Sequence, residues 1–293
     1  MSNALAPAQA QLVEAAAEYA GAARAANTLK AYRSDWGAFE TWCKAQGFAP
    51  LPAMPSTVAL YAAHLAQDGR KVSTLARALV SISQAHKAAG APSPTSDESV
   101  KTVVQGIRKT LGVAQEKKAP MRRADLVAAL AAETSPRDRA LLLFGFAGGF
   151  RRSELAALDV ADLERVSAGY VVTLRRSKTN QDGRLERKFI ALGLAELCPV
   201  RALEAWLAGR TAGPVFGVCT KTIARILKRA AKRAGKDPDR YSGHSLRRGL
   251  ITEAHLAGVN DADTMRHVGI KSEEVFRGYI EESELVARAV RVL

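Results

Sequence analysis

Two short motifs in the second half of the chain carry side chains that could act together on a phosphate group. The sequence G-F-R-R-S-E-L contains Arg151 and, three residues later, Glu154, which could orient a basic partner on the same helical face. The sequence H-S-L-R-R contains His244 and Arg247, which share one helix face in the same way. Arginine forms paired hydrogen bonds with phosphate oxygens, and histidine can move a proton near neutral pH. Either motif alone is also typical of a solvated helix surface.

Two further side chains could take part in the same chemistry. Lys178 lies in S-K-T at the end of a predicted strand, just before a turn at residues 182–183, where a lysine can be inserted toward a groove or a leaving group. Tyr279 lies near the end of a predicted helix and could act as a nucleophile. Most hairpin lysines are merely exposed and most such tyrosines belong to a core, so neither residue is informative alone.

The elements that must position these residues fall into two parts. We expect an N-terminal helical domain over residues 1–113, a polar linker with the sequence A-Q-E-K-K-A-P at 114–120, and a mixed C-terminal domain over 121–293. Helices are predicted in the first part at residues 12–19, 27–46, 55–69, 73–90 and 97–112. The second part has predicted helices at 122–133, 136–147, 199–209, 220–235, 244–258, 272–280 and 284–293, and predicted strands at 170–174 and 188–192.

The charge of the chain points to nucleic acid as a partner. The 293 residues include 43 Lys and Arg against 29 Asp and Glu, a net charge of +14, and the pI is near 10.0. Both parts are basic, as expected if both touch one extended polyanion, since phosphate neutralisation supplies most non-specific affinity for nucleic acid.

Other features exclude several classes of protein. The longest wholly apolar run, residues 140–150, has 11 residues, whereas a membrane span needs roughly 18 or more. Residues 1–13 lack the pattern of a signal peptide. Three widely spaced cysteines, Cys43, Cys198 and Cys219, provide neither a disulfide framework nor a zinc cluster. We therefore expect a cytoplasmic protein with no metal site and no cofactor.

Taken together, the motifs closely resemble the tyrosine recombinase (phage integrase) family, which includes the Cre-like and Xer-like recombinases. The resemblance rests on G-F-R-R-S-E-L, the hairpin S-K-T, H-S-L-R-R-G and R-H-V-G-I-K-S-E-E-V-F-R-G-Y-I, in that order, and it covers nearly the whole chain. It implies a mainly α fold. An N-terminal helical core-binding bundle would be joined to a mixed α/β catalytic domain with a small antiparallel sheet, and the two would form a C-shaped DNA clamp.

The resemblance also implies residue roles. Arg151 and Arg247 would be the catalytic arginines, with Glu154 supporting the first. Lys178 would be the hairpin lysine, His244 the motif histidine and Tyr279 the nucleophile of a covalent 3′-phosphotyrosyl intermediate.

One position departs from the family pattern. Nine residues before the tyrosine the family usually has a histidine or tryptophan, whereas this chain has Ile270. Ile270 offers no hydrogen-bond donor, so it could buttress Tyr279 without contacting phosphate, and we expect a working but slower enzyme. Nearby His267 is three residues too early and should face elsewhere.

Several basic and polar side chains could contact DNA. On the predicted helix 73–90 the candidates are Arg77, Ser81, Gln84 and Lys87, and on the predicted helix 220–235 they are Lys221, Arg225, Lys228 and Lys232. The alternative for each row is a solvated helix face.

The expected partner is double-stranded DNA with inverted-repeat target sites, bound by a homotetramer that is a monomer or weak dimer when free. The amphipathic tail Glu284–Leu293 could dock on a neighbouring protomer or pack on its own domain.

Three functions remain open at this point. The leading interpretation is a site-specific DNA recombinase used in integration, excision or dimer resolution. The alternatives are relaxation of DNA strands in the manner of a type IB topoisomerase, and a catalytically impaired DNA-binding relative. Neither the target sequence nor a need for an accessory protein can be derived from the chain.

Overall fold

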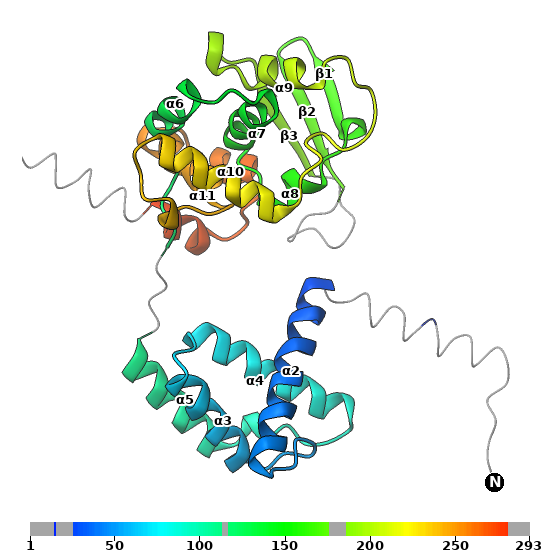
Figure 1. Ribbon diagram of the computed structural model, residues 1–293, viewed down its shortest axis with the longest axis vertical. Helices are drawn as coiled ribbons and strands as arrows, with labels where there is room; N and C mark the ends of the chain where they lie inside the picture. Colours follow the sequence, from blue (N-terminus) through cyan, green and yellow to red (C-terminus); the bar gives the residue numbers. More distant parts are fainter. Residues whose placement is uncertain (1–14, 16–25, 113–116, 176–185, 281–293) are drawn as a thin grey trace, which may run out of the picture. The chain divides into compact units, whose positions relative to one another are not determined.

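The computed structural model of the protein describes residues 15, 26–112, 117–175 and 186–280. The chain divides into two units, residues 1–116 and 117–293, and each has its own hydrophobic core (Figure 1). Within these described ranges, no helix is long and apolar enough to cross a membrane.

The first unit is a bundle of helices, as predicted. Its helices are α2 (Ala26–Gln46), α3 (Pro55–Gln67), α4 (Val72–Ala88) and α5 (Glu98–Leu111), and a short 3₁₀ turn, η1 (Pro94–Ser96), precedes α5. These four helices match the predicted ranges to within two residues at each end. The helix predicted at residues 12–19 lies outside the described residues, apart from residue 15.

Apolar side chains at helical spacing hold this bundle together. Helix α2 packs against α4 and α3 packs against α5. Phe39, Tyr61, Leu75 and Ile82 are all at most 4% exposed, and the rings of Phe39 and Tyr61 meet edge to face with centroids 5.0 Å apart. Asp97 begins α5 as predicted, because its carboxylate accepts a hydrogen bond from the backbone N–H of Ser99.

The second unit combines helices with one small sheet, and the predicted fold class is confirmed. Its helices are α6 (Arg123–Ala131), α7 (Pro136–Ala147), α8 (Arg152–Ala157), α9 (Pro199–Leu207), α10 (Thr220–Arg233), α11 (Ser245–Leu256) and α12 (Asp261–Val268). Residues 273–280 are also helical. The 3₁₀ turns are η2 (Val160–Asp162), η3 (Ala195–Leu197) and η4 (Pro238–Arg240).

Helix α7 is the centre of this unit. Its residues from Ala140 to Gly145 are buried without interruption, and it packs against α9 and α11. A helix that is apolar on every side is stable only inside a core. Because α7 leads directly into the glycines at 148 and 149, the segment that carries Arg151 begins from a helix whose middle is fully buried.

The sheet is antiparallel, with the strand order β1-β2-β3. The strands are β1 (Leu163–Val166), β2 (Gly169–Leu174) and β3 (Glu186–Ala191). Along β3, Lys188 and Ile190 point into the unit, whereas Arg187 and Phe189 are exposed. The two predicted strands are confirmed as β2 and β3. The hairpin between them, with Lys178, lies outside the described residues.

Residues 117–120 belong to the second unit, although we expected them in the linker. The Lys118 ammonium donates to the Asp239 carbonyl at 2.8 Å, and the Ala119 N–H donates to the Arg240 carbonyl at 2.7 Å. The Met121 N–H donates to the Ser245 carbonyl at 2.8 Å. These bonds tie the start of the unit to the segment just before and within α11.

Candidate active site

Gly149 makes the turn that joins α7 to α8. Its φ of +53° is in the left-handed region, and a Cβ there would lie 2.7 Å from a methyl group of Val268 and 2.9 Å from one of Leu250. Only glycine therefore fits this backbone conformation and this space. The turn directs the Gly149 carbonyl toward Arg247, whose guanidinium donates a hydrogen bond to it at 2.8 Å.

Arg151 follows this turn and is the N-cap residue of α8. Glu154 holds it twice, because one carboxylate oxygen accepts from the Arg151 N–H at 2.8 Å and the other accepts from its guanidinium at 2.6 Å. The guanidinium also donates to the Gly269 carbonyl at 3.1 Å. The Glu154 side chain is 1% exposed and the Arg151 side chain 13%. The predicted support of Arg151 by Glu154 therefore has a matching geometry.

Arg247 lies beside Arg151 and is almost fully buried, with 2% of the residue exposed. Burial lowers the pKa of Arg247, as does the charge of Arg151, whereas the charges of Tyr279 and Glu154 and a side-chain hydrogen bond with Tyr279 act in the opposite direction. Two like charges are thus held close together in a poorly solvated place. An anion placed against them would relieve this repulsion.

Tyr279 is half-buried at one edge of a small apolar cluster. The cluster contains Ile251, Val268, Ile270, Phe276 and Ile280, and Tyr279 packs against it. Ile270 is 9% exposed. Ile270 therefore belongs to the apolar cluster against which Tyr279 packs, as a buttress for Tyr279 would need to.

Arg248 also contacts the nucleophile candidate. Its guanidinium carbon lies 5.4 Å from the centre of the Tyr279 ring, which is a cation–π geometry. Residue 248 is 8% exposed. From the sequence alone this arginine has no assigned role, and H-S-L-R-R is also typical of a helix cap with solvated arginines.

His244 is exposed at the beginning of α11, and its backbone N–H donates to the Ser242 hydroxyl at 3.3 Å. The structure therefore brings Arg151, Glu154, Arg247, Ile270 and Tyr279 into one region, and His244 is exposed at the start of α11, the helix that carries Arg247. Lys178 belongs to the residues that the structure does not describe.

The ring of His267 is bound to the main chain at the end of α7. Its ring nitrogen Nε2 lies 2.9 Å from the Ala147 carbonyl, to which it donates in the neutral form. Burial lowers the pKa of this imidazole, and the charges of Lys188 and Arg247 lower it further, against the bond to Ala147. The ring is thus a structural link between α12 and the end of α7.

Lys188 is the residue near this site that the sequence analysis missed. Its side chain is fully buried, and its ammonium donates to the His267 carbonyl at 2.6 Å. The sequence does contain a sign that Lys188 is buried. In a strand that begins at Lys188, this residue lies on the same face as the apolar Ile190. A fully buried lysine is rare unless it is paired, so a lysine at an inward position of a strand calls for a partner.

The two rows of candidate DNA-binding residues have different outcomes. On α4, the prediction for Ser81 is wrong, because Ser81 is 2% exposed and its hydroxyl donates to the Tyr32 carbonyl at 2.7 Å. Arg77 is exposed but bound to the carboxylate of Asp35 through two hydrogen bonds. Gln84 is half-buried and Lys87 is exposed.

On α10 the basic residues form one exposed face. Lys221, Arg225, Lys228 and Lys232 are all exposed, while Ile223, Ile226 and Leu227 on the other face are buried. Lys228 pairs with Asp239 at 2.6 Å. Cys219 lies at the start of this helix, where hydrogen bonds, first of all with the Thr222 side chain, lower its thiol pKa to about 7.

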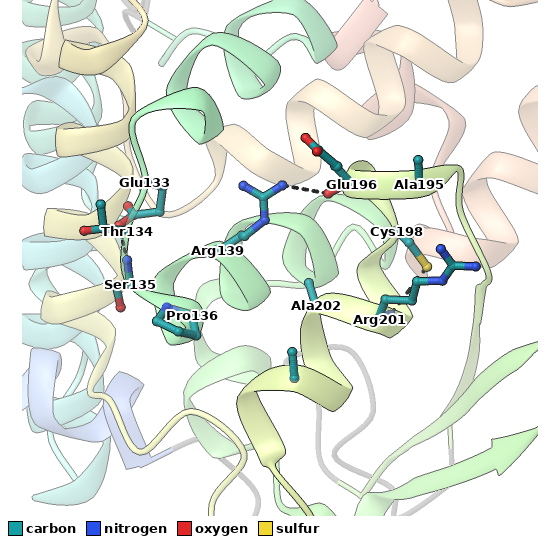
Figure 2. Close-up of a pocket in the computed structure, with 11 residues that line it drawn as sticks. Glu133, Thr134, Ser135, Pro136, Arg139, Ala195, Glu196, Cys198, Arg201 and Ala202 are labelled. Atoms are coloured by element: carbon teal, nitrogen blue, oxygen red, sulfur yellow. Dashed lines mark hydrogen bonds between the residues drawn. The ribbon is translucent and has the colours of Figure 1, made fainter.

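A separate cavity of about 390 Å³ lies between the start of α7 and α9 (Figure 2). Arg139, Glu196 and Arg201 contribute to its lining, and the guanidinium of Arg139 donates to the Glu196 carbonyl at 2.8 Å. None of the candidate catalytic residues lines it. Elsewhere in the described part of the chain, His, Cys, Asp and Glu side chains nowhere gather in a group of three that could hold a metal ion.

Comparison with known proteins finds relatives over most of the chain. The Phage integrase family matches residues 119–284. An integrase/recombinase XerD homologue of Selenomonas ruminantium is 37% identical over 285 residues, which cover 89% of this chain and 83% of that protein. The tyrosine recombinase XerD of Rhizobium meliloti is 26% identical over 303 residues, which cover 93% of this chain and 92% of that protein.

Solved structures share the fold. A lambda integrase fragment, bound as a dimer to a COC′ core site, has a TM-score of 0.61 and 18% identity and covers 92% of this chain and 94% of its own. A lambda integrase tetramer bound to a Holliday junction has a TM-score of 0.62 and 17% identity, with 95% and 78% covered.

A two-unit, mainly helical chain with a buried pair of arginines beside a tyrosine is the arrangement expected of an enzyme that cleaves and rejoins DNA through a tyrosine. With the family match over more than half of its length and a 37% identical relative, the chain belongs to the phage integrase family. It is a tyrosine recombinase, a site-specific DNA recombinase.

Proposed function

We propose that Arg151, Lys178, His244, Arg247 and Tyr279 are the catalytic residues of this recombinase, with Glu154 and Ile270 in support. The observation that carries the assignment is the contact of Arg247 with Tyr279 beside Arg151. This contact places two guanidiniums, which can bind phosphate, beside the Tyr279 hydroxyl, which can form a covalent bond to phosphorus.

The reaction begins with attack of the Tyr279 hydroxyl oxygen on a DNA phosphorus. A bond forms between this oxygen and phosphorus, and the bond from phosphorus to the 5′ oxygen breaks. His244 accepts the phenolic proton, directly or through the phosphate, and Lys178 donates a proton to the departing 5′ oxygen. The 3′-phosphotyrosyl link retains the bond energy, so religation to another strand requires no nucleotide hydrolysis.

The arginine pair stabilises the transition state of this reaction. An ordinary phenol has a pKa of about 10 and is a weak nucleophile at neutral pH. Arg151 and Arg247 bind the non-bridging oxygens and neutralise the charge that grows on the five-coordinate phosphorus. Their burial strengthens this effect, because charge interactions are poorly screened in a desolvated site.

The exposed face of α10 supplies contacts to the DNA backbone. Lys221, Arg225, Lys228 and Lys232 place positive charge along one side of this helix, while its other side is anchored in the core. In the first unit, Arg77, Gln84 and Lys87 of α4 contact the same duplex. Arg77 must exchange its bond with Asp35 for one to DNA.

We further propose that the enzyme acts as a homotetramer on pairs of inverted-repeat sites in the bacterial cytosol or nucleoid. This assembly is supported by the lambda integrase tetramer bound to a Holliday junction, which shares the fold. The tail Glu284–Leu293, which the sequence analysis assigned to docking between protomers, lies outside the described residues.

The assignment is tested by covalent capture of DNA. Duplexes are selected by binding to the wild-type protein from a randomised pool, and nicked versions are used to trap the cleaved complex. We expect a protein–DNA adduct that is lost in Tyr279→Phe and kept in Tyr170→Phe, a matched removal of a hydroxyl in the same unit. An adduct that survives in Tyr279→Phe would refute the assignment.

A second assay with the same protein distinguishes recombination from topoisomerase activity and from DNA binding without cleavage. Supercoiled DNA with two copies of the selected site should give recombinant products. Relaxed topoisomers without recombinants would indicate topoisomerase activity, and bound but uncut DNA would indicate an impaired relative.

A further inference from the structure

Lys188 lies at the centre of the contacts that join β3 to the end of α12. Its side chain has no exposed surface, and its ammonium lies 2.6 Å from the His267 carbonyl, 3.8 Å from a Glu186 carboxylate oxygen and 5.6 Å from the centre of the Phe150 ring. A buried ammonium must be hydrogen-bonded or paired to be tolerated. The partners of the Lys188 ammonium therefore identify the part of the backbone that this lysine holds in place.

The group that it holds is the backbone that binds Arg151. The His267 carbonyl, which accepts from Lys188, is two residues before the Gly269 carbonyl, which accepts from Arg151. Gly269 has a φ of +70°, so the chain turns sharply between these two bonds. The ring of His267 is bonded on its other side to the Ala147 carbonyl. The end of α12 is thus fixed from β3 by Lys188 and from α7 through His267.

The charges around Lys188 come from four elements. Glu186 lies on β3 itself, Arg151 and Glu154 lie at the start of α8, Arg247 lies on α11, and the imidazole of His267 lies on α12. Burial lowers the pKa of Lys188 to about 8, Glu154 and Glu186 oppose this change, and the two arginines add to it. The ammonium form is therefore the one that neutral conditions favour, and alkaline conditions remove it well below the pH at which an exposed lysine titrates.

We propose that Lys188 is a positioning residue for DNA cleavage, whose ammonium fixes the turn after α12 and, through the Gly269 carbonyl, the guanidinium of Arg151. The proposal rests on the assignment of Arg151 to phosphate binding made above. Lys188 itself does not touch the DNA. Its loss allows the turn to shift, and a displacement of about 1 Å in a phosphate-binding group can lower a rate by about 10²-fold.

The test uses the trapped-adduct assay with the selected, nicked duplex and three variants of the full chain. Lys188→Met removes the charge with little change in shape, and Lys188→Arg keeps a cation at every pH. Arg187→Met is the matched control, because it removes one exposed positive charge from the adjacent position of the same strand. Rates of adduct formation are measured from about pH 7 to about pH 10, together with duplex affinity and thermal melting.

We expect Lys188→Met to form adduct roughly 10- to 100-fold more slowly at neutral pH while its affinity for the duplex changes little, and Arg187→Met to resemble the wild type. Lys188→Arg should retain most of the rate and keep it at alkaline pH, where the wild type loses activity. A Lys188→Met rate equal to wild type would overturn the proposal.

If Lys188→Met does not fold, the wild type and Lys188→Arg still test the proposal. An identical fall in their rates of adduct formation at alkaline pH would also overturn it. Failure of the proposed catalytic assignment is a different result. In that case the wild type forms no adduct, or Tyr279→Phe still forms one.

Discussion

The guanidinium of Arg248 lies over the ring of Tyr279, with 5.4 Å between its central carbon and the ring centre. A cation over an aromatic face at a partly desolvated site contributes about 1–2 kcal/mol. This contact with α11 restrains the phenol ring. The apolar cluster that contains Ile270, against which Tyr279 packs, restrains it further. The nucleophile candidate is thus oriented by neighbours that have no part in the bond changes.

Arg248→Met is therefore expected to slow adduct formation by about tenfold, since tenfold corresponds to about 1.4 kcal/mol. Single-turnover rates with the nicked duplex measure the effect. Arg277→Met is the control, because Arg277 is on the same helix as Tyr279 with a side chain that is 71% exposed. Equal losses in the two variants would mean that total charge, rather than the contact with the ring, determines the rate.

Gly269→Ala is expected to damage both stability and cleavage. The φ of +70° disfavours alanine, and its Cβ would lie 2.1 Å from a Glu186 carboxylate oxygen. Gly258→Ala is a matched control, since Gly258 has a φ of +74° and nothing within 4 Å of the added atom. We expect a loss of about 1 kcal/mol in the free energy of unfolding for Gly258→Ala and a larger loss for Gly269→Ala. Chemical denaturation measures both, and similar values would argue against close packing at Gly269.

Ile270→His is expected to accelerate cleavage at some cost in stability. A donor at this position adds a transition-state hydrogen bond, and such a donor commonly contributes about 10²-fold or more in rate. The imidazole replaces a side chain that is 9% exposed in an apolar cluster, so the melting temperature should fall. If the rate does not rise, Ile270 serves only to pack Tyr279.

Lys188→Met is expected to stabilise the protein at neutral pH while it impairs catalysis. Burial lowers the pKa of Lys188 from 10.5 to about 8, which corresponds to a penalty of up to roughly 3 kcal/mol for the charged form. The unfolded chain binds more protons than the folded chain between about pH 8 and pH 10.5, so the contribution of Lys188 to stability rises with pH across this window. Denaturation of the two proteins in parallel gives the difference, and a difference independent of pH would contradict the shift.

Cys219 provides a probe of the α10 surface. Its pKa is lowered to about 7, whereas Cys43 and Cys198 are at most 1% exposed. We expect iodoacetamide to modify Cys219 first near neutral pH, and the selected duplex to slow this reaction several-fold if α10 binds DNA. Mass spectrometry identifies the modified residue, and Cys219→Ser verifies it. Equal modification rates with and without the duplex would exclude this face from the DNA interface.

Much of the fold could be predicted from the sequence, because the signals were local. The helices of the first unit begin at residues such as Pro55 and end near glycines, and strand β2 has an apolar run between turn residues. The first strand, β1, was missed because its four residues include two charged ones and only half-buried apolar ones. Helix α12 was missed because only Thr264 and Val268 of its eight residues are buried, too few for a helical pattern.

The site itself was only partly accessible to sequence reasoning. The motifs together assigned Arg151, Glu154, Arg247 and Tyr279 through their resemblance to the family, although none of these residues is informative alone. Lys188 and the carbonyls that orient the arginines depend on contacts between residues about 80 to 120 positions apart, which no local pattern records. Ser81 was assigned to the wrong environment because an i, i+4 spacing defines a face of α4 but not whether another helix covers it.

The carbonyls of Gly149 and Gly269 aim the two arginines, so main-chain geometry acts together with the Glu154 and Lys188 side chains in setting the separation of the cations. Side chains that touch neither the arginines nor these turns could therefore be exchanged in related proteins while the two cations keep their position on the scissile phosphate. A one-residue insertion or deletion in either glycine turn would misdirect a guanidinium even with every catalytic side chain still encoded.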